Sequence, residues 1–312
     1  MKKRLLISGA LFLFFLAALI GRGIYAAGLG SDAARLWQGE SATAYRRISV
    51  YFNRGSGVTA NDAVYSRSGI VNSIAAADET AKALTVWGRI EESRILVDSR
   101  ELYCQTVLSG EDFFLMRRFL FLSGGDYGFG KGKIVLNEYA AYALFGSADC
   151  VGMMLKRNDE YEKVHGVVRD GEKTPIVYAY LADREGEITF FEAILPEYVN
   201  GYARNVIDTC FYEDENTVIR ENDLRYKTEN LRKELKKEFD ESEQPLSFRV
   251  PFWEYRERRA ERILTVWNVA AMILSLPFFV SLVPILWDLG TRLIRWGKER
   301  KEARKRRRSL LE

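Results

Sequence analysis

The glycine-rich stretch GGDYGFGKGK, residues 124–133, has the spacing that most suggests chemistry. Gly125, Gly130 and Lys131 match the first part of a phosphate-binding loop, G-x-x-x-x-G-K-[ST]. Such a loop also needs a hydroxyl residue for Mg²⁺ and a following helix whose N-terminus faces the phosphates. Gly132 stands at the hydroxyl position, and the Ile-Val-Leu run after it favours a strand. We therefore interpret the stretch as a turn between two strands, and we expect no bound cofactor.

The residues for other catalytic or metal sites are also missing. His165 is the one histidine of the chain, and it lies in a β-rich run with no recognisable partner. The motifs H-E-x-x-H, C-x-x-C and G-x-S-x-G and the calcium-binding loop are all absent from the sequence. We expect no catalytic residue and no metal, and the chain is predicted not to be an enzyme. A membrane-anchored hydrolase is a further hypothesis that lacks candidate residues.

Three cysteines, Cys104, Cys150 and Cys210, are too few for a fold built on disulfides. The sequence allows one disulfide with an odd thiol. Three unpaired, partly buried thiols are an equally good interpretation.

Two apolar segments, residues 5–27 and 263–289, are candidate membrane spans. The second holds about 25 uncharged residues, enough to cross a bilayer. The first follows the basic residues 1–4 and is either an uncleaved anchor or a signal peptide cleaved near Ala27. Tyr25 is a poor residue at such a cleavage site, which favours the anchor. With either interpretation the following chain lies outside the cytoplasm.

The charge distribution predicts the orientation of both spans. Residues 2–4 carry +3, and the tail from Thr291 onward carries ten Lys/Arg and three Glu, or +7. Since the chain has a net charge of +3, the residues between carry about −7. Basic ends and an acidic middle predict a two-pass membrane protein with both termini cytoplasmic. A basic run so close to a span is a topology signal that touches anionic lipid, so we expect no nucleic acid partner.

The extracytoplasmic residues 28–262 alternate between strand and helix patterns, which predicts an α+β domain between the two transmembrane helices. Thr59 and Asp62 form a capping box for one helix, Asn137 caps a second that ends at Gly146, and Pro196 begins a third. A fourth, highly charged helix is expected over residues 221–241. Residues 112–125 are expected to belong to the sheet, and residues 246–252 are expected to be extended. Linkers are expected at residues 28–35 and 241–245. Strands are expected at residues 46–52, 82–90, 100–108, 134–137, 161–170, 175–181 and 187–195.

The region from Lys133 to Asp170 resembles the MacB-type periplasmic core domain of ABC transporter permeases. In that family a strand V-L-N-E leads into a helix ending L-F-G, then a D-x-V-G turn and a strand ending in G-V-V-x-D. His165 stands where the family usually has an apolar residue. The matching residues here are Val135, Leu136, Asn137 and Glu138; Leu144, Phe145 and Gly146; Asp149, Val151 and Gly152; and Gly166, Val167, Val168 and Asp170.

The resemblance covers most of the external domain and implies two lobes. One lobe would combine residues 46–108 with residues 187–250. The other would be a strand-rich insertion over residues 109–186. The resemblance implies that the motif residues maintain the fold of the domain and do not form a catalytic or binding site.

The resemblance also implies a location, the bacterial plasma membrane, and a function. Family permeases pair as dimers, bind cytoplasmic ATPases and relay ATP-driven motion to the external domain. This chain has two spans where the family has four, which favours an accessory or relay subunit of such a transporter system, acting in export or in envelope processes. Its implied partners are an ABC ATPase subunit and either a full-length permease or a second copy of itself. The alternative is a stand-alone, membrane-anchored surface protein that binds a peptide, a lipid or an envelope partner without an ATPase.

The tail, residues 290–312, occupies the position of the family's coupling helix for the ATPase. We expect it to contact either an ATPase subunit or membrane lipid. The candidate contact residues are Arg292, Arg295, Trp296, Arg304, Lys305, Arg306, Arg307 and Arg308.

Overall fold

The computed structural model describes residues 2–27, 29, 32–231 and 250–309. The chain divides into two compact units, each described by itself. The larger unit comprises residues 31–230 and 236–258 and contains all the strands. The smaller unit contains the N-terminal helix and the long C-terminal helix from Arg259 onward.

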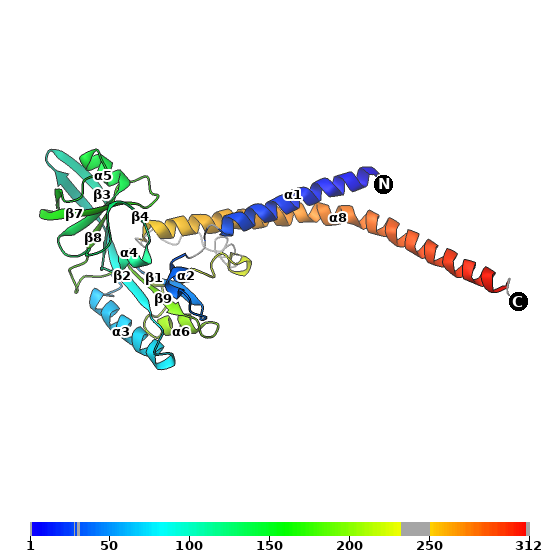
Figure 1. Cartoon of the computed structure of the whole chain (residues 1–312), viewed down its shortest axis with the longest axis horizontal. Coiled ribbons are helices and arrows are strands. Elements are labelled where there is room, and N and C mark those ends of the chain that lie inside the picture. Colours follow the sequence, from blue (N-terminus) through cyan, green and yellow to red (C-terminus); the bar gives the residue numbers. More distant parts are fainter. Residues whose placement is uncertain (1, 28, 30–31, 232–249, 310–312) are drawn as a thin grey trace. The chain divides into compact units, whose positions relative to one another are not determined.

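A ten-stranded mixed sheet forms the larger unit (Figure 1). Its order is β10-β1-β9-β2-β3-β8-β5-β7-β4, with β6 paired to β2 and β7. The pairs β3–β8 and β5–β7 are parallel, and the other pairs are antiparallel. The strands are β1 Tyr45–Phe52, β2 Leu84–Val97, β3 Arg100–Ser109, β4 Leu120–Gly124, β5 Lys133–Asn137, β6 Met154–Arg157, β7 Glu160–Arg169, β8 Ile176–Tyr180, β9 Phe190–Pro196 and β10 Thr217–Glu221.

Side chains alternate between the two faces of this sheet, and each face is covered by helices. One face carries two cores, one under α3 and α6 and the other under α5. The opposite face carries a single core, which includes residues of α2, α4 and the first turn of α8. The helices of this unit are α2 Asp32–Gln38, α3 Ala60–Ala77, α4 Phe113–Met116, α5 Glu138–Phe145 and α6 Tyr202–Asp208, and α8 runs from Phe252 to Ser309.

The predicted α+β class is confirmed by this arrangement, and several predicted elements are confirmed at their ends. The side chain of Thr59 accepts from Asp62 N, and the Asp62 carboxylate bonds back to Thr59, which completes the capping box. Asn137 caps α5, and Gly146 ends it with φ of 76°. The left-handed backbone conformation at this position favours glycine, because glycine lacks a Cβ.

Other predicted elements were wrong. Pro196 ends β9, and the helix after it begins only at Tyr202, because Gly201 supplies the left-handed turn before it. A linker was expected over residues 28–35, but α2, Asp32–Gln38, begins inside it. Residues 112–125 hold the short helix α4 before β4.

The C-terminal part of the domain also differs from expectation. Glu221 ends β10, residues 222–226 are turns, and a helix begins at Thr228. The rest of the expected charged helix, the linker 241–245 and most of the expected extended segment 246–252 lie outside the described residues. Phe252, the last residue of that segment, begins α8.

The two predicted lobes correspond to opposite ends of the one sheet. Strands from residues 46–108 and 187–250 form the run β10-β1-β9-β2-β3, and strands from residues 109–186 form the run β8-β5-β7-β4. The parallel pair β3–β8 joins the two runs. Ile95 and Cys104 of the first run pack into the core under α5, so the two ends share side chains. The lobe boundaries themselves stay a prediction.

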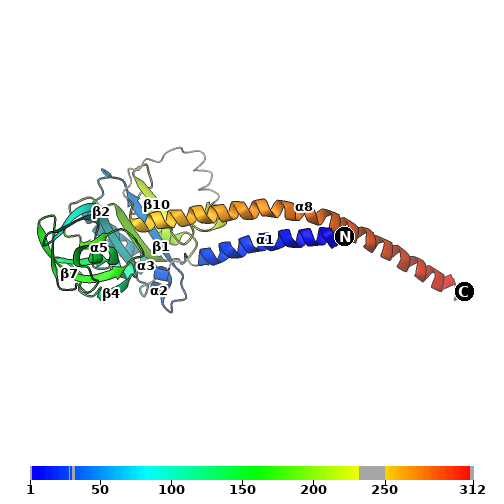
Figure 2. The same ribbon diagram turned by 90° about the horizontal axis from the view of Figure 1, so that it is seen from above.

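The smaller unit pairs α1, Lys2–Ala27, with α8, and the two helices lie side by side in both views (Figures 1 and 2). Ser8 donates to Ser281 Oγ at 2.8 Å, and Arg22 donates to Asn268 Oδ1 at 2.6 Å. Both helices are long and apolar enough to cross a membrane, α1 over Leu6–Ala26 and α8 within Phe252–Lys298. α8 is a single helix of 58 residues that contains Pro277 and Pro284.

Candidate functional site: the start of the long helix α8

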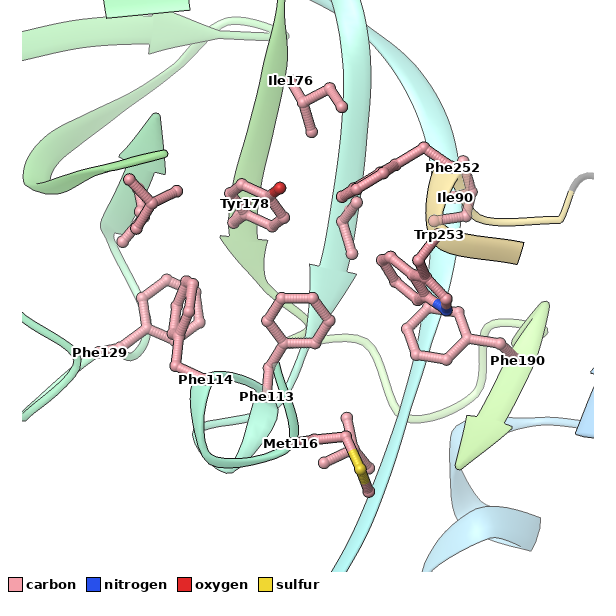
Figure 3. Packing of buried hydrophobic residues seen from close by; sticks show 14 of the residues in the cluster. Ile90, Phe113, Phe114, Met116, Phe129, Ile176, Tyr178, Phe190, Phe252 and Trp253 are labelled. Carbon is pink, nitrogen blue, oxygen red and sulfur yellow. The ribbon is translucent and has the colours of Figure 1, made fainter. Parts of the chain in front are cut away.

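The first turn of α8 is part of the domain core. Phe252 and Trp253 are both buried, and their rings meet at 5.1 Å between centroids. Trp253 also packs against Phe113 of α4 and Phe190 of β9, at 5.7 and 5.4 Å (Figure 3). Aromatic pairs at these separations add to the free energy gained by burying their surface. The start of α8 is therefore fixed in the core of the domain.

A buried carboxylate, Glu192 of β9, joins three elements around this aromatic core. Its side chain is 1% exposed. Its Oε1 accepts from Ser49 Oγ at 2.9 Å and from Trp253 Nε1 at 3.1 Å, and it pairs with Arg117. The Arg117 guanidinium also lies over the Trp253 ring, 4.3 Å from its centroid. A buried charge needs such partners because desolvation is costly.

A second buried group ties the next turn of α8 to the domain. Arg225, in the turns after β10, donates through both terminal nitrogens to Glu254, at 2.9 and 3.1 Å. Arg225 also bonds to Glu257, which pairs in turn with Arg47 of β1. Arg258 donates to Glu254 at 2.9 Å from one turn further along α8. Bidentate pairs of this kind fix geometry as well as charge.

Turn residues after β10 complete this group. Asn222 donates to Ser49 Oγ at 2.7 Å and accepts from Arg225 at 3.1 Å. The Arg47 backbone N–H donates to the Asp223 carboxylate at 2.7 Å. We call the whole set the α8 anchor: Arg47, Ser49, Arg117, Glu192, Asn222, Asp223, Arg225, Glu254, Glu257 and Arg258, with Phe252 and Trp253.

The ionisation of the anchor follows from its burial and charge. Burial by itself raises the pKa of Glu254, but Arg225 and Arg258 outweigh it and lower the pKa to about 2. Burial likewise lowers the pKa of Arg47, yet Glu257 and Glu192 outweigh it and hold the pKa above its ordinary value. For Arg117 burial dominates and its pKa is lowered. The carboxylates of Glu254 and Glu257 are thus held ionised by the arginines around them.

α8 also contacts the other end of the sheet. Arg256 donates to the Asp170 carbonyl oxygen at 2.8 Å and to the Glu172 carboxylate at 2.6 Å. Both acceptors lie in the turn between β7 and β8. The first two turns of α8 therefore hold both ends of the sheet at once.

Two of the residues that carry the family resemblance meet in this same turn. Asn137 Oδ1 accepts from Ala140 N at 2.9 Å and from Ile176 N at 3.0 Å. Its Nδ2 donates to the Thr174 carbonyl oxygen at 2.8 Å and to the Asp170 carboxylate at 3.4 Å. One buried amide thus caps α5 and fixes the β7–β8 turn.

Asp170 completes that arrangement. It accepts from Tyr178 Oη at 2.8 Å, and burial raises the pKa of its carboxyl. Burial, together with the charge of Asp170, also raises the pKa of Tyr178. The turn that Arg256 contacts is therefore built on a buried hydrogen-bond network.

The other motif residues serve local structure. Glu138 pairs with Arg169 at 2.9 Å, and Gly152 has φ of 90° and donates to the Val164 carbonyl oxygen. A Cβ on Gly166 would lie 2.9 Å from the Phe121 ring, so β7 can approach β4 only with glycine there. Leu144 is buried, Phe145 is partly buried, and Asp149 and Val151 are exposed.

The stretches that first suggested chemistry have structural roles. Residues 125–132 connect β4 and β5 as a turn, with no helix after them, which confirms that interpretation. The His165 ring contacts the Tyr127 carbonyl oxygen at 3.0 Å. The thiols of Cys104, Cys150 and Cys210 are unpaired. Among the residues that the structure describes, no cluster of three or more potential metal ligands occurs.

The tail residues lie on the last part of α8. Trp296 is 52% exposed, and the Arg300 guanidinium lies 3.9 Å from the centroid of its ring. The helix continues without interruption to Ser309, through the positions of Arg304 and Arg308. The tail residues belong to the smaller unit of the chain, and the motif residues belong to the larger one.

The comparison with solved structures finds domains of transporter proteins. The periplasmic region of MacB from Actinobacillus actinomycetemcomitans is 13% identical, with a TM-score of 0.43, over 64% of this chain and 94% of that one. The extracellular domain of the noncanonic ABC-type transporter YknZ from Gram-positive bacteria is 12% identical, with a TM-score of 0.40, over 56% of this chain and 99% of that one. A domain of a permease protein from Porphyromonas gingivalis is 12% identical, with a TM-score of 0.37, over 57% and 89%. No protein-family model and no curated protein matches the chain.

Sequence reasoning named the motif residues but missed the α8 anchor. A signal for it existed. Glu192 interrupts the apolar run FFEAIL, and Arg117 interrupts the apolar run FFLMRRFLFL. A charge inside a buried strand or an apolar segment requires a partner of opposite charge. The sequence alone does not say which acidic and basic residues pair, because the partners are far apart in the chain.

Proposed function

We propose that the chain is a non-enzymatic membrane subunit of a MacB-type ABC transporter system, and that it relays ATPase-driven motion to its extracytoplasmic domain. The observation that carries this proposal is the α8 anchor. α8 begins inside the buried core of the domain and continues as one helix through an apolar stretch into a basic tail. At 1.5 Å per residue its 58 residues extend about 87 Å.

A relay needs a helix that cannot slip at its point of attachment. Pulling α8 out of the domain would separate the buried Arg225 from the carboxylates of Glu254 and Glu257. Such a loss is strongly unfavourable. A displacement of α8 is therefore expected to move the sheet before it detaches from it. Because Arg256 contacts the β7–β8 turn, the same displacement also reaches the other end of the sheet.

The proposal includes a topology and a partner. Residues 5–27 and 263–289 cross the plasma membrane, both termini face the cytoplasm, and the domain lies outside. ATP is hydrolysed by a partner subunit, which the tail contacts through its basic residues, as a family coupling helix would. The alternative contact of the tail is anionic lipid, which the same basic residues attract.

The first experiment is affinity purification of the tagged full chain from native membranes in mild detergent, with mass spectrometry of the proteins that accompany it. A stoichiometric ABC ATPase, with or without a four-span permease, is the expected result. Its consistent absence from folded, inserted protein would replace the proposal with the alternative. That alternative is a stand-alone surface protein that binds a peptide, a lipid or an envelope partner without an ATPase.

A tail variant separates ATPase contact from lipid contact. We expect reversal of Arg304, Lys305, Arg306, Arg307 and Arg308 to Glu to abolish co-purification of the ATPase, with membrane insertion retained. The control variant reverses the same number of exposed charges, none of them in the tail. Unchanged co-purification with the tail variant would assign the tail to lipid.

A further inference from the structure

A pocket of about 330 Å³ lies beside the α8 anchor, on the face of the sheet that α8 covers. Two of its lining residues, Ile90 of β2 and Val250 just before α8, are buried members of the core on this face. Cys104 of β3 also lines it, although the Cys104 side chain packs into the core under α5 on the opposite face. A cavity of this size accommodates a small organic molecule. The site stands apart from the proposed relay, because neither an ATPase nor the tail contributes to it.

Two tyrosines stand at the opening of the pocket. Tyr103 of β3 is 71% exposed, and Tyr255 in the first turn of α8 is 51% exposed. Exposed tyrosine rings present apolar faces of negative potential, which attract organic cations. The two rings come from different elements, so a molecule between them contacts the sheet and the start of α8 together.

The charge of the pocket comes from two neighbouring glutamates with different surroundings. Glu91 is compensated by Arg89 at 3.5 Å and by Arg157 at 3.4 Å. Glu92 also lines the pocket and is exposed, and within the described part of the chain it has no ion-pair or hydrogen-bond partner. Counting only the residues that the structure describes, the pocket presents one carboxylate without an ion pair beside two aromatic rings and an apolar wall.

We propose that this pocket binds a small organic ammonium ion. The cation would lie between Tyr103 and Tyr255 with its charge facing Glu92, and its apolar body would contact Ile90 and Val250. Aromatic faces with a nearby carboxylate are the physical means by which proteins recognise alkylammonium groups. A neutral molecule of the same shape would keep the apolar contacts and lose both charge-dependent ones.

The test compares choline with its neutral isostere, 3,3-dimethylbutan-1-ol. Binding to the full chain in maltoside micelles is measured by ligand-observed NMR titration. Choline is expected to bind at least about tenfold more tightly than the alcohol. Equal binding of the two probes, or no binding of choline, would overturn the proposal.

Two variants assign the binding to this pocket. Glu92→Gln keeps the shape of the side chain and removes its charge, and it is expected to weaken choline about tenfold while the alcohol is unaffected. Glu215→Gln removes an exposed carboxylate elsewhere and is expected to change neither probe. Choline binding that survives Glu92→Gln unchanged would contradict the assignment.

Discussion

Glu254 has no exposed surface, yet it carries a charge that two arginines of different elements neutralise. Arg225 is itself 4% exposed on its side chain, whereas Arg258 is 35% exposed. The two arginines therefore make the same kind of bond in different surroundings. Their removal should have very different effects on stability.

We expect Arg225→Met to lower the free energy of unfolding by about 3–5 kcal/mol, because it removes the buried partner of Glu254 and Glu257 and leaves Glu254 only the more exposed Arg258. Arg258→Met is the matched control and is expected to cost less than about 1 kcal/mol, as for other solvent-accessible pairs. Denaturant unfolding of the full chain in detergent, followed by tryptophan fluorescence, measures both. Equal losses would contradict the anchor as described.

The double variant Arg225→Met with Glu254→Met checks the cause. If the loss comes from an uncompensated charge, removal of both charges recovers a large part of it. If the stability loss of the double variant instead equals the sum of the two single losses, the cause is lost side-chain packing and not an unpaired charge.

Acid should weaken the anchor in a defined range of pH. The pKa of Glu254 falls from its ordinary 4.5 to about 2 in the folded domain. A carboxyl with a lowered pKa contributes stability that is complete above about pH 4.5 and is lost as the pH falls towards 2. Glu254→Gln should therefore lower the Tm most near neutral pH. The difference in Tm between this variant and the natural chain should shrink as the pH falls from about 4.5 towards 2. Glu101→Gln, at an exposed pair, should show little difference at any pH.

Asn137 is the motif residue with the largest expected effect. Asn137→Ala removes the cap of α5 and leaves the buried N–H of Ile176 unpaired, at a cost of about 2–3 kcal/mol. Asn61→Ala, on the exposed side of α3, is the control and should change the Tm little. A small effect at Asn137 would show that water replaces its bonds.

At the scale of elements, β2 changes partner in the middle of its length. Leu84 to Gly88 pair with β9 on one side, and Gly88 to Val97 pair with β3 on the other. A Cβ on Gly88 would lie 2.1 Å from the Leu108 carbonyl oxygen and 2.6 Å from the Phe190 ring. Glycine at position 88 therefore allows β2 to pair with β9 and β3 at the same residue.

We expect Gly88→Ala to cost about 3 kcal/mol or more, because neither the β3 backbone nor the buried ring can move away freely. Gly110→Ala is the control, since a Cβ there would meet nothing within 4 Å. Thermal unfolding and the yield of folded protein from membranes measure both. A Gly88→Ala variant as stable as Gly110→Ala would contradict the close approach.

Local patterns predicted the elements whose ends carry their own signals. Thr59 with Asp62, and Asn137 with Gly146, define helix ends through side chains a few residues apart. The start of α6 was wrong because Gly201, and not Pro196, provides the turn that the helix needs. The strand β10 was missed because its five residues follow a charged segment and are stabilised by pairing with β1.

The α8 anchor could not be predicted from such local patterns. Arg47 and Glu257 are 210 residues apart, and Arg117 and Glu192 are 75 apart. The sequence shows that these charges need partners, and the order of strands in the sheet decides which ones they meet. Only β-sheet topology, which depends on long-range pairing, brings them together.

At the scale of the whole molecule, the proposed topology is tested by labelling. Cysteine introduced at Tyr127, which is 96% exposed, should react with a membrane-impermeant maleimide in intact cells from which any outer membrane has been removed. Cysteine introduced at Ser309 should react only after the plasma membrane is opened. The natural chain gives the background from its own thiols. Labelling of both positions in intact cells would place the tail outside.

The position of α8 at the end of the chain has a consequence for biosynthesis. Arg47, Arg117 and Arg225 are all synthesised before the ribosome reaches Glu254 and Glu257, and two of the three depend on those carboxylates. A nascent chain that terminates before Phe252 lacks the carboxylates of Glu254 and Glu257, which pair with Arg47 and Arg225, and lacks Trp253 from its core. Such a product should remain incompletely folded and be open to envelope proteases. The domain thus matures only in chains that have also made the start of the helix, and a soluble version of it should extend at least to Arg258.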